Sequence, residues 1–104
     1  MSAFAELGLS QPLVAAVDRL GFVEPTPIQQ EIIPQLLQDR TDCVGLAQTG
    51  TGKTAAFGLP LLQRLNLDQR EVQALVLAPT RELCLQISKE VNSFGQQMKG
   101  LRMA

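Results

Sequence analysis

The chain has 104 residues, of which 45% are hydrophobic and 18% charged, a balance typical of one small globular domain and not of a disordered segment. Its formal net charge is -1 and its pI is near 5.3, so no overall positive field attracts it to nucleic acid or to an anionic membrane. All four aromatic residues are phenylalanine, which disfavours a base-stacking platform of several rings. Any contact with RNA or DNA phosphate therefore has to be local.

The chain contains no histidine, and its two cysteines, Cys43 and Cys84, lack the spacing of metal ligands. We expect both cysteines to be small core residues. The first residues include Glu6 and no basic start followed by a long apolar run, and no segment has the apolar length needed to span a bilayer. The sequence therefore predicts a cytoplasmic protein.

The first predicted helix begins at Ser10, has Pro12 in its first turn and is ended by Gly21, at the position where helices commonly stop. Its apolar face comprises Leu13, Val14, Val17 and Leu20.

A second helix is predicted from Thr26, the N-cap, with Pro27 in the first helical position. We expect Pro34 to kink or break it. Its buried side comprises Ile28, Ile32, Ile33, Leu36 and Leu37.

The next segment, residues 42–47, is mostly apolar and predicts a strand that leads into the octapeptide Ala47-Gln48-Thr49-Gly50-Thr51-Gly52-Lys53-Thr54. The spacing is that of a loop that holds the phosphates of a nucleoside triphosphate. Gly50 and Gly52 have no Cβ, so successive backbone N–H groups can turn inward around an anion. The strict pattern has glycine where this chain has Ala47, and a small side chain suffices there. The alternative is a turn between strand and helix that binds no ligand.

Lys53 and Thr54 open the following helix, predicted over residues 53–65. The positive end of the helix dipole adds to the Lys53 ammonium, which can reach the terminal phosphates. Thr54 can offer its hydroxyl to Mg²⁺, which takes few protein ligands alongside phosphate oxygens. We expect Gly58 and Pro60 to make this helix irregular.

Residues 66–70 predict a polar turn, and Val72–Ala78 predicts a strand buried on both faces and closed by Pro79. Thr80 then caps a long helix that has Glu82 in its first turn and ends at Gly95 and Gly100. Its apolar face comprises Leu83, Ile87, Val91 and Phe94, and residues 101–104 have the pattern of a strand that is beginning.

Strands that alternate with helices predict an α/β fold with a largely parallel sheet. A parallel sheet needs neighbouring strands on both sides to pair its backbone groups, and only two full strands are predicted here. We therefore expect the chain to be a piece of a domain.

Gln29 has two interpretations. Its amide carries one acceptor and two donors and can pair with the amino group and a ring nitrogen of adenine, whereas guanine presents two acceptors on that edge. Alternatively, because Gln29 lies three residues after Thr26, it can complete a capping box by bonding back to the N–H of the cap. The spacing alone favours the capping box.

Three segments, in this order and spacing, closely resemble the DEAD-box family of ATP-dependent RNA helicases, in which they are called the Q motif, motif I and motif Ia. They are Gly21-Phe22-Val23-Glu24-Pro25-Thr26-Pro27-Ile28-Gln29 with an isolated Phe4 upstream, then Ala47 to Thr54, then Pro79-Thr80-Arg81-Glu82-Leu83. A phosphate loop is shared by many NTPases, but the nine-residue motif with its upstream phenylalanine is specific to this family. The resemblance covers essentially the whole chain.

The resemblance implies that Gln29 reads adenine, that Phe4 packs against the base, and that Thr26 helps link this motif to the phosphate loop. Phe4 in isolation is more often a core residue. The resemblance also implies that ATP binds at Ala47, Gln48, Thr49, Gly50, Thr51, Gly52, Lys53 and Thr54, that Mg²⁺ binds at Thr54, and that Lys53 and Thr54 are catalytic. It further implies contact of Pro79, Thr80, Arg81 and Glu82 with the RNA sugar-phosphate backbone. The pattern alone favours a plain capped helix at that last segment.

The fold that the resemblance implies is a parallel-sheet, RecA-like P-loop NTPase domain of the α/β class, of which residues 1–104 would be about the N-terminal half. The Asp-Glu-Ala-Asp motif of the family is not in this chain, so we expect no useful ATP hydrolysis from it alone. In the family's sheet, strands absent from this chain separate the two strands predicted here, so aggregation or partial unfolding is expected. An ATPase of another phosphate-loop class and a non-enzymatic nucleotide-binding fragment remain alternatives.

Overall fold

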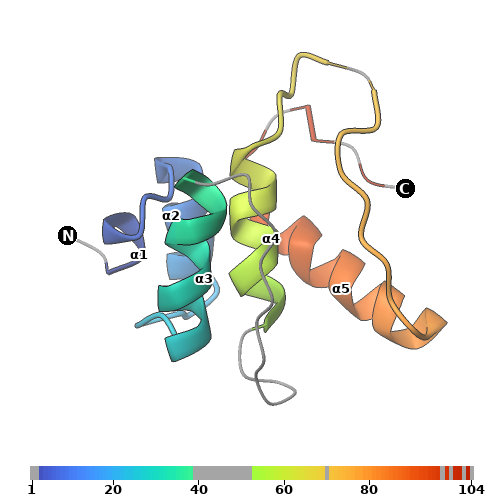
Figure 1. The fold of residues 1–104 in the computed structure, drawn as a ribbon. Coiled ribbons are helices and arrows are strands. Elements are labelled where there is room, and N and C mark those ends of the chain that lie inside the picture. Colours follow the sequence, from blue (N-terminus) through green and yellow to red (C-terminus); the bar gives the residue numbers. More distant parts are fainter. Residues whose placement is uncertain are drawn as a thin grey trace.

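The computed structural model describes residues 3–38, 53–69, 71–96, 98, 100, 101 and 103. Over these residues the chain forms five helices (Figure 1). They are α1 (Ala3–Glu6), α2 (Gln11–Arg19), α3 (Pro27–Gln38), α4 (Lys53–Gln63) and α5 (Arg81–Phe94). The predicted strand at residues 42–47, including Cys43, lies outside the described residues.

Helix α2 confirms the first predicted helix. Ser10 is its N-cap, and Leu13 and Val17 are almost fully buried. Gly21 follows the helix with φ +89°, a left-handed conformation that suits glycine. The prediction for Leu20 was wrong, because this side chain is 45% exposed. Leu20 is the C-cap, so it stands past the last regular turn of the apolar face.

Helices α3 and α4 continue through the prolines that were expected to disrupt them. Pro34 lies inside α3, which runs on to Gln38, and Pro60 lies inside α4, which runs on to Gln63. A proline inside a helix loses one backbone hydrogen bond and crowds the preceding turn. Burial offsets that cost, because Ile33 beside Pro34 and Leu59 beside Pro60 have no exposed surface.

Helix α4 lies between α3 and α5, while α2 packs on α5 and α1 on α2 (Figure 1). Gly58 makes the approach of α4 to α5 possible, since a Cβ there would lie 3.3 Å from Cγ2 of Val91. The core formed between these helices comprises Phe4, Leu9, Leu13, Val14, Val17, Ile33, Ala55, Leu59, Leu62, Val91 and Phe94. The helices thus share one hydrophobic core.

The predicted strand at Val72–Ala78 is not formed, and no strand is assigned anywhere within the described residues. The segment is exposed, with Val72 at 90%, Leu75 at 77% and Leu77 at 83%. A strand obtains its hydrogen bonds from neighbouring strands, and the described residues provide none beside this segment. Leu101 and Met103, predicted at the start of a further strand, likewise have no strand assignment.

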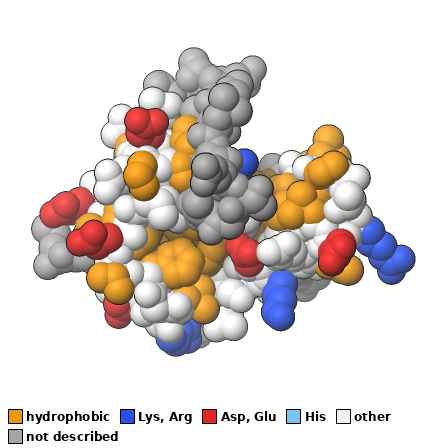
Figure 2. Space-filling view, turned by 90° about the horizontal axis from the view of Figure 1, so that it is seen from below, with side chains coloured by type: hydrophobic (Ala, Val, Ile, Leu, Met, Phe, Trp, Pro, Cys, Tyr) orange, Lys and Arg blue, Asp and Glu red, His pale blue; other side chains and the backbone are white. Residues whose placement is uncertain are grey.

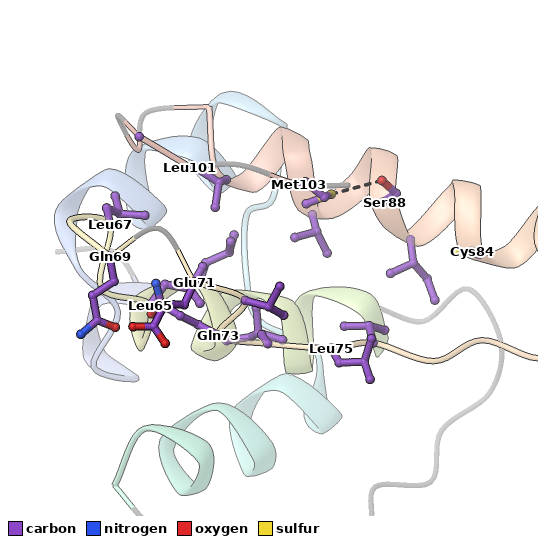
Figure 3. Close-up of a pocket in the computed structure, with 18 of the residues that line it drawn as sticks. Leu65, Leu67, Gln69, Glu71, Gln73, Leu75, Cys84, Ser88, Leu101 and Met103 are labelled. Atoms are coloured by element: carbon purple, nitrogen blue, oxygen red, sulfur yellow. Dashed lines mark hydrogen bonds between the residues drawn. The ribbon is translucent and has the colours of Figure 1, made fainter.

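A cavity of about 840 Å³ lies between this extended segment, the C-terminal end of α4, and α5 (Figure 3). Leu65 and Leu75 line it from one side, and Cys84, Leu101 and Met103 from the other. Cys84 is exposed, so the prediction that it is a core residue was wrong. Within the described part of the chain, no strand covers this face of α5.

The polar turn predicted after α4 is present over residues 66–69. The Asn66 side chain accepts a hydrogen bond from the Asp68 N–H, and the Asn66 carbonyl accepts one from the Gln69 N–H. The Gln73 amide pairs with both backbone groups of Asn66, at 2.7 and 2.6 Å. This pairing fixes the start of the extended segment against the turn.

Surface charge is mixed. Acidic and basic side chains are interspersed with apolar ones on the face that Figure 2 shows, in agreement with a net charge of -1. Among the described residues, no helix has both the length and the apolar character required to cross a membrane. The cytoplasmic location remains a prediction from the sequence.

Gln63, in the last turn of α4, holds the link between α1 and α2. Its Oε1 accepts a hydrogen bond from the Ser10 N–H at 2.7 Å, and its Nε2 donates to the Gly8 carbonyl at 2.8 Å. The Gln63 amide therefore pairs with one backbone N–H and one backbone carbonyl, as the backbone of a neighbouring strand would. Two neutral hydrogen bonds of this kind contribute about 1–2 kcal/mol together.

Gln63→Ala in the full-length protein is therefore expected to accelerate hydrogen exchange at the Ser10 amide by roughly 5- to 30-fold. Exchange resolved to residues by NMR, or to peptides by mass spectrometry, measures this. Gln86→Ala, which changes an exposed glutamine of α5, serves as the control. Unchanged exchange at Ser10 in the Gln63 variant would refute the role of this amide.

Candidate nucleotide-binding site

The N-terminus of α4 carries two of the predicted phosphate-binding residues. Lys53 and Thr54 are its first two residues, and Lys53 is exposed while Thr54 is half-buried. The first backbone N–H groups of a helix have no acceptor within it, and the helix dipole is positive there. Both features favour an anion next to Lys53. The remaining predicted residues, Ala47, Gln48, Thr49, Gly50, Thr51 and Gly52, lie outside the described residues.

Gln29 forms a capping box with Thr26 at the N-terminus of α3. The Thr26 N–H donates to Gln29 Oε1 at 2.9 Å, and the Gln29 N–H donates to Thr26 Oγ1 at 3.4 Å. The first distance is typical of a good hydrogen bond and the second is long. The capping box is therefore confirmed, and its stronger half is the bond made by the amide of Gln29.

Phe4 lies in the hydrophobic core at 1% exposure. Its ring centre is 6.1 Å from that of Phe22, which in turn is 6.0 Å from that of Phe94 in an edge-to-face arrangement. These separations lie in the favourable range for aromatic pairs. The three rings join α1, the segment after α2 and the end of α5, so the core interpretation of Phe4 is confirmed. Its contact with a base stays a prediction.

Gln29 and the predicted phosphate-binding end of α4 lie at the same end of a helix pair. Helices α3 and α4 run side by side in the same direction, with both N-terminal ends low in the view of Figure 1. At the other end, the Arg64 guanidinium donates to the Leu36 carbonyl at 3.2 Å, which fixes that alignment. Gln29 is 2% exposed, so a base can contact its side chain only after neighbouring groups move.

The four residues predicted to contact RNA are Pro79, Thr80, Arg81 and Glu82, and all four are exposed. Thr80 is the N-cap of α5, and its Oγ1 accepts a hydrogen bond from the Leu83 N–H at 3.1 Å. The predicted cap and helix are confirmed. Arg81 and the free N–H groups of the first turn are available to a phosphate, but they lie at the opposite end of α5 from Phe94 and the aromatic contacts.

The roles of two residues and one short helix in positioning the candidate site were not identified from the sequence. Phe22 lies within the predicted adenine motif, but the spacing of the phenylalanines gave no signal that Phe4, Phe22 and Phe94 lie in a row. Gln63 and the short helix α1 left no signal either, because the hydrogen bonds of Gln63 join residues more than 50 positions apart.

These features are those expected of the phosphate-loop class of proteins: a Lys-Thr pair opens a helix, and a polar side chain lies at the same end of the neighbouring helix. A sequence model of the DEAD/DEAH box helicase family matches residues 26–104. The chain belongs to this family.

Similar proteins agree with this assignment. The chain is 55% identical over 95 residues to the DEAD-box ATP-dependent RNA helicase CshA of Geobacillus kaustophilus. The matched residues are 91% of this chain and 20% of the relative. It is 50% identical over 102 residues to the ATP-dependent RNA helicase DeaD of Escherichia coli, covering 98% of this chain and 16% of that protein. The chain thus spans about a fifth or less of these relatives.

The structure resembles that of Saccharomyces cerevisiae Dbp5 bound to RNA and ADP BeF3, with a TM-score of 0.89, 38% identity, and coverage of 95% of this chain and 26% of the other. The DEAD box protein of Methanococcus jannaschii matches with a TM-score of 0.84 and 40% identity over 90% of this chain and 26% of the other. The predicted fold class, an α/β RecA-like P-loop domain, is thereby confirmed. Within the described part, only its helices are formed.

Thr80→Ala is expected to destabilise the first turn of α5 by about 1 kcal/mol, because the Leu83 N–H loses its acceptor. Thr80→Ser keeps the hydroxyl and is expected to behave like the unchanged protein. Hydrogen exchange at Leu83 in the full-length protein distinguishes the two. Equal exchange rates in both variants would show that the cap bond does not stabilise α5.

Proposed function

We propose that this chain is the N-terminal part of the first RecA-like domain of an ATP-dependent RNA helicase, which couples ATP binding and hydrolysis to local separation of RNA strands. Support comes from membership of the DEAD/DEAH box family and from relatives that are named ATP-dependent RNA helicases. The observation that carries the proposal is the position of Lys53 and Thr54 at the N-terminus of α4, at the same end of the helix pair as Gln29.

ATP is the proposed nucleotide. Its phosphates would lie against residues 47–54, where the Lys53 ammonium and the free N–H groups of α4 offset negative charge. Its base would lie near Phe4 and Gln29. Both side chains are buried in the core, so binding of the base would have to rearrange the N-terminal part of the site.

Mg²⁺ is the proposed metal ion, and its one proposed ligand in this chain is the hydroxyl of Thr54. The half-buried position of Thr54, directly after the lysine, fits a hydroxyl that shares a metal ion with phosphate oxygens. The ion would neutralise charge that develops on the phosphates. Lys53 would stabilise the same charge from the helix end.

RNA is the proposed partner of Pro79, Thr80, Arg81 and Glu82, through its sugar-phosphate backbone. The exposure of these residues and the free N-terminus of α5 support contact without reading of bases. Two of the solved Dbp5 structures that resemble this chain contain RNA and ADP BeF3.

Residues 1–104 contain no Asp-Glu-Ala-Asp sequence, so we propose that they do not hydrolyse ATP by themselves. Other parts of a complete helicase would supply the acidic groups and the arginine finger. An ATPase of another phosphate-loop class, which the sequence alone left open, is excluded by the family match.

Lys53→Ala in the full-length protein is expected to abolish RNA-stimulated ATP hydrolysis, because the charge on the transferred phosphate loses its lysine partner. A steady-state phosphate-release assay measures this. Lys89→Ala, an exposed lysine of α5, is the matched control and is expected to leave turnover unchanged. Undiminished turnover in the Lys53 variant would remove this residue from its proposed role and would contradict the proposed function.

Gln29→Ala is expected to weaken ATP binding by about 1–3 kcal/mol and to remove the preference for ATP over GTP, since one base edge is left unpaired. Equilibrium titration with both nucleotides measures the effect. Gln38→Ala, an exposed glutamine at the end of α3, is the control. Equal affinity of the unchanged protein for ATP and GTP would contradict the reading of adenine.

A further inference from the structure

The amide of Gln29 is held in one orientation by the backbone of the chain. Its Oε1 lies 2.9 Å from the backbone nitrogen of Thr26, and the side chain is 2% exposed. A backbone N–H can only donate a hydrogen bond. If the amide turned over, Nε2 would face that donor, and both groups would lose a partner in a buried place where water does not compensate.

A fixed amide orientation determines what a purine base would meet. The carbonyl oxygen has a second lone pair, so Oε1 can accept from the Thr26 N–H and from a further donor at the same time. Nε2 has two hydrogens and acts only as a donor. The side chain therefore presents an acceptor and a donor in a set order.

The two purines differ on the edge that would face this pair. Adenine shows an amino donor beside a ring-nitrogen acceptor, and guanine shows two acceptors. A freely rotating amide can turn its NH₂ group towards the guanine oxygen, so glutamine by itself discriminates only in part. An amide with a fixed Oε1 would place that oxygen against the guanine oxygen, without a hydrogen between them.

We propose that the backbone N–H of Thr26 is a positioning group that makes Gln29 selective for adenine over guanine. This inference rests on the proposed function, in which Gln29 contacts the base. It adds that the helix cap, and not the glutamine alone, sets the choice of nucleotide. It also assigns a role to the backbone of Thr26 that is separate from any role of its side chain.

The test compares three variants of the full-length protein by the ratio of its affinities for ADP and GDP. Thr26→Ala keeps the N–H and loses only the hydroxyl of the long 3.4 Å bond. Thr26→Pro removes the N–H, and Gln29→Ala removes the amide itself. The ratio is the measured quantity, because a loss of general stability lowers both affinities together.

We expect Thr26→Ala to keep the ADP to GDP ratio within about twofold and Thr26→Pro to lower it about tenfold, which is equivalent to 1.4 kcal/mol. IDP, which has the guanine oxygen but lacks the 2-amino group, is expected to be rejected by the unchanged protein as strongly as GDP. Binding of IDP as tight as that of ADP would overturn the proposal, because rejection would then come from the 2-amino group.

A second variant covers the case in which Thr26→Pro does not fold. Residues 1–42 can be synthesised with an ester in place of the amide at position 26 and joined at Cys43 to the remainder of the protein. The ester keeps the Thr26 side chain and lacks the N–H. A lowered ratio in the ester protein supports the proposal, and an unchanged ratio overturns it.

Failure of the proposed function gives a different result. If Gln29→Ala keeps the full ADP to GDP ratio, Gln29 does not read the base, and both proposals are wrong. If Gln29→Ala loses the ratio while the ester protein keeps it, the proposed function stands and only the role of the Thr26 N–H is refuted. 7-Deaza-ADP, which lacks the ring-nitrogen acceptor, is expected to bind more weakly than ADP to the unchanged protein and equally to the Gln29 variant.

Discussion

Burial of α4 between α3 and α5 is the constraint on which the rest of the described structure depends. Six residues of this eleven-residue helix are buried: Ala55, Ala56, Gly58, Leu59, Pro60 and Leu62. Full burial of a leucine contributes about 1.5–3 kcal/mol, so Leu59 and Leu62 alone outweigh the cost of a proline inside the helix. The ends of α4 are thereby fixed, with Lys53 at one and Gln63 at the other.

The N-terminal segment is attached to this framework at two points of different chemistry. Gln63 holds residues Gly8 and Ser10 through two hydrogen bonds, and Phe4 packs into a row of three rings that ends at Phe94. A four-residue helix such as α1 is not stable alone, because nucleating a helix costs more free energy than the hydrogen bonds of one turn contribute. Tertiary contacts must therefore keep Phe4 in place, which links the adenine side of the candidate site to α4 and α5.

Local signals in the sequence predicted the helices and their caps, and they failed where structure depends on distant residues. Ser10, Thr26 and Thr80 are caps because their neighbours along the chain set the helix start, and all three are confirmed. Exposure of Leu20 and Cys84 and continuation of α3 through Pro34 depend on what packs nearby, and no spacing rule contains that information. For Gln29 two interpretations were open from the sequence, a helix cap and an adenine contact, and the oxygen and nitrogen of its amide allow both.

The Val72–Ala78 segment shows why the predicted helices form in the described part of the chain while this predicted strand does not. A helix makes its backbone hydrogen bonds with residues four positions away, so α3, α4 and α5 need only one another's apolar faces. A strand depends on other strands for the same bonds, and an apolar composition cannot replace them. Gln73 pairs its side chain with Asn66 at the start of the segment, whereas Val72, Leu75 and Leu77 remain exposed. Val72 and Leu75 line a cavity of about 840 Å³.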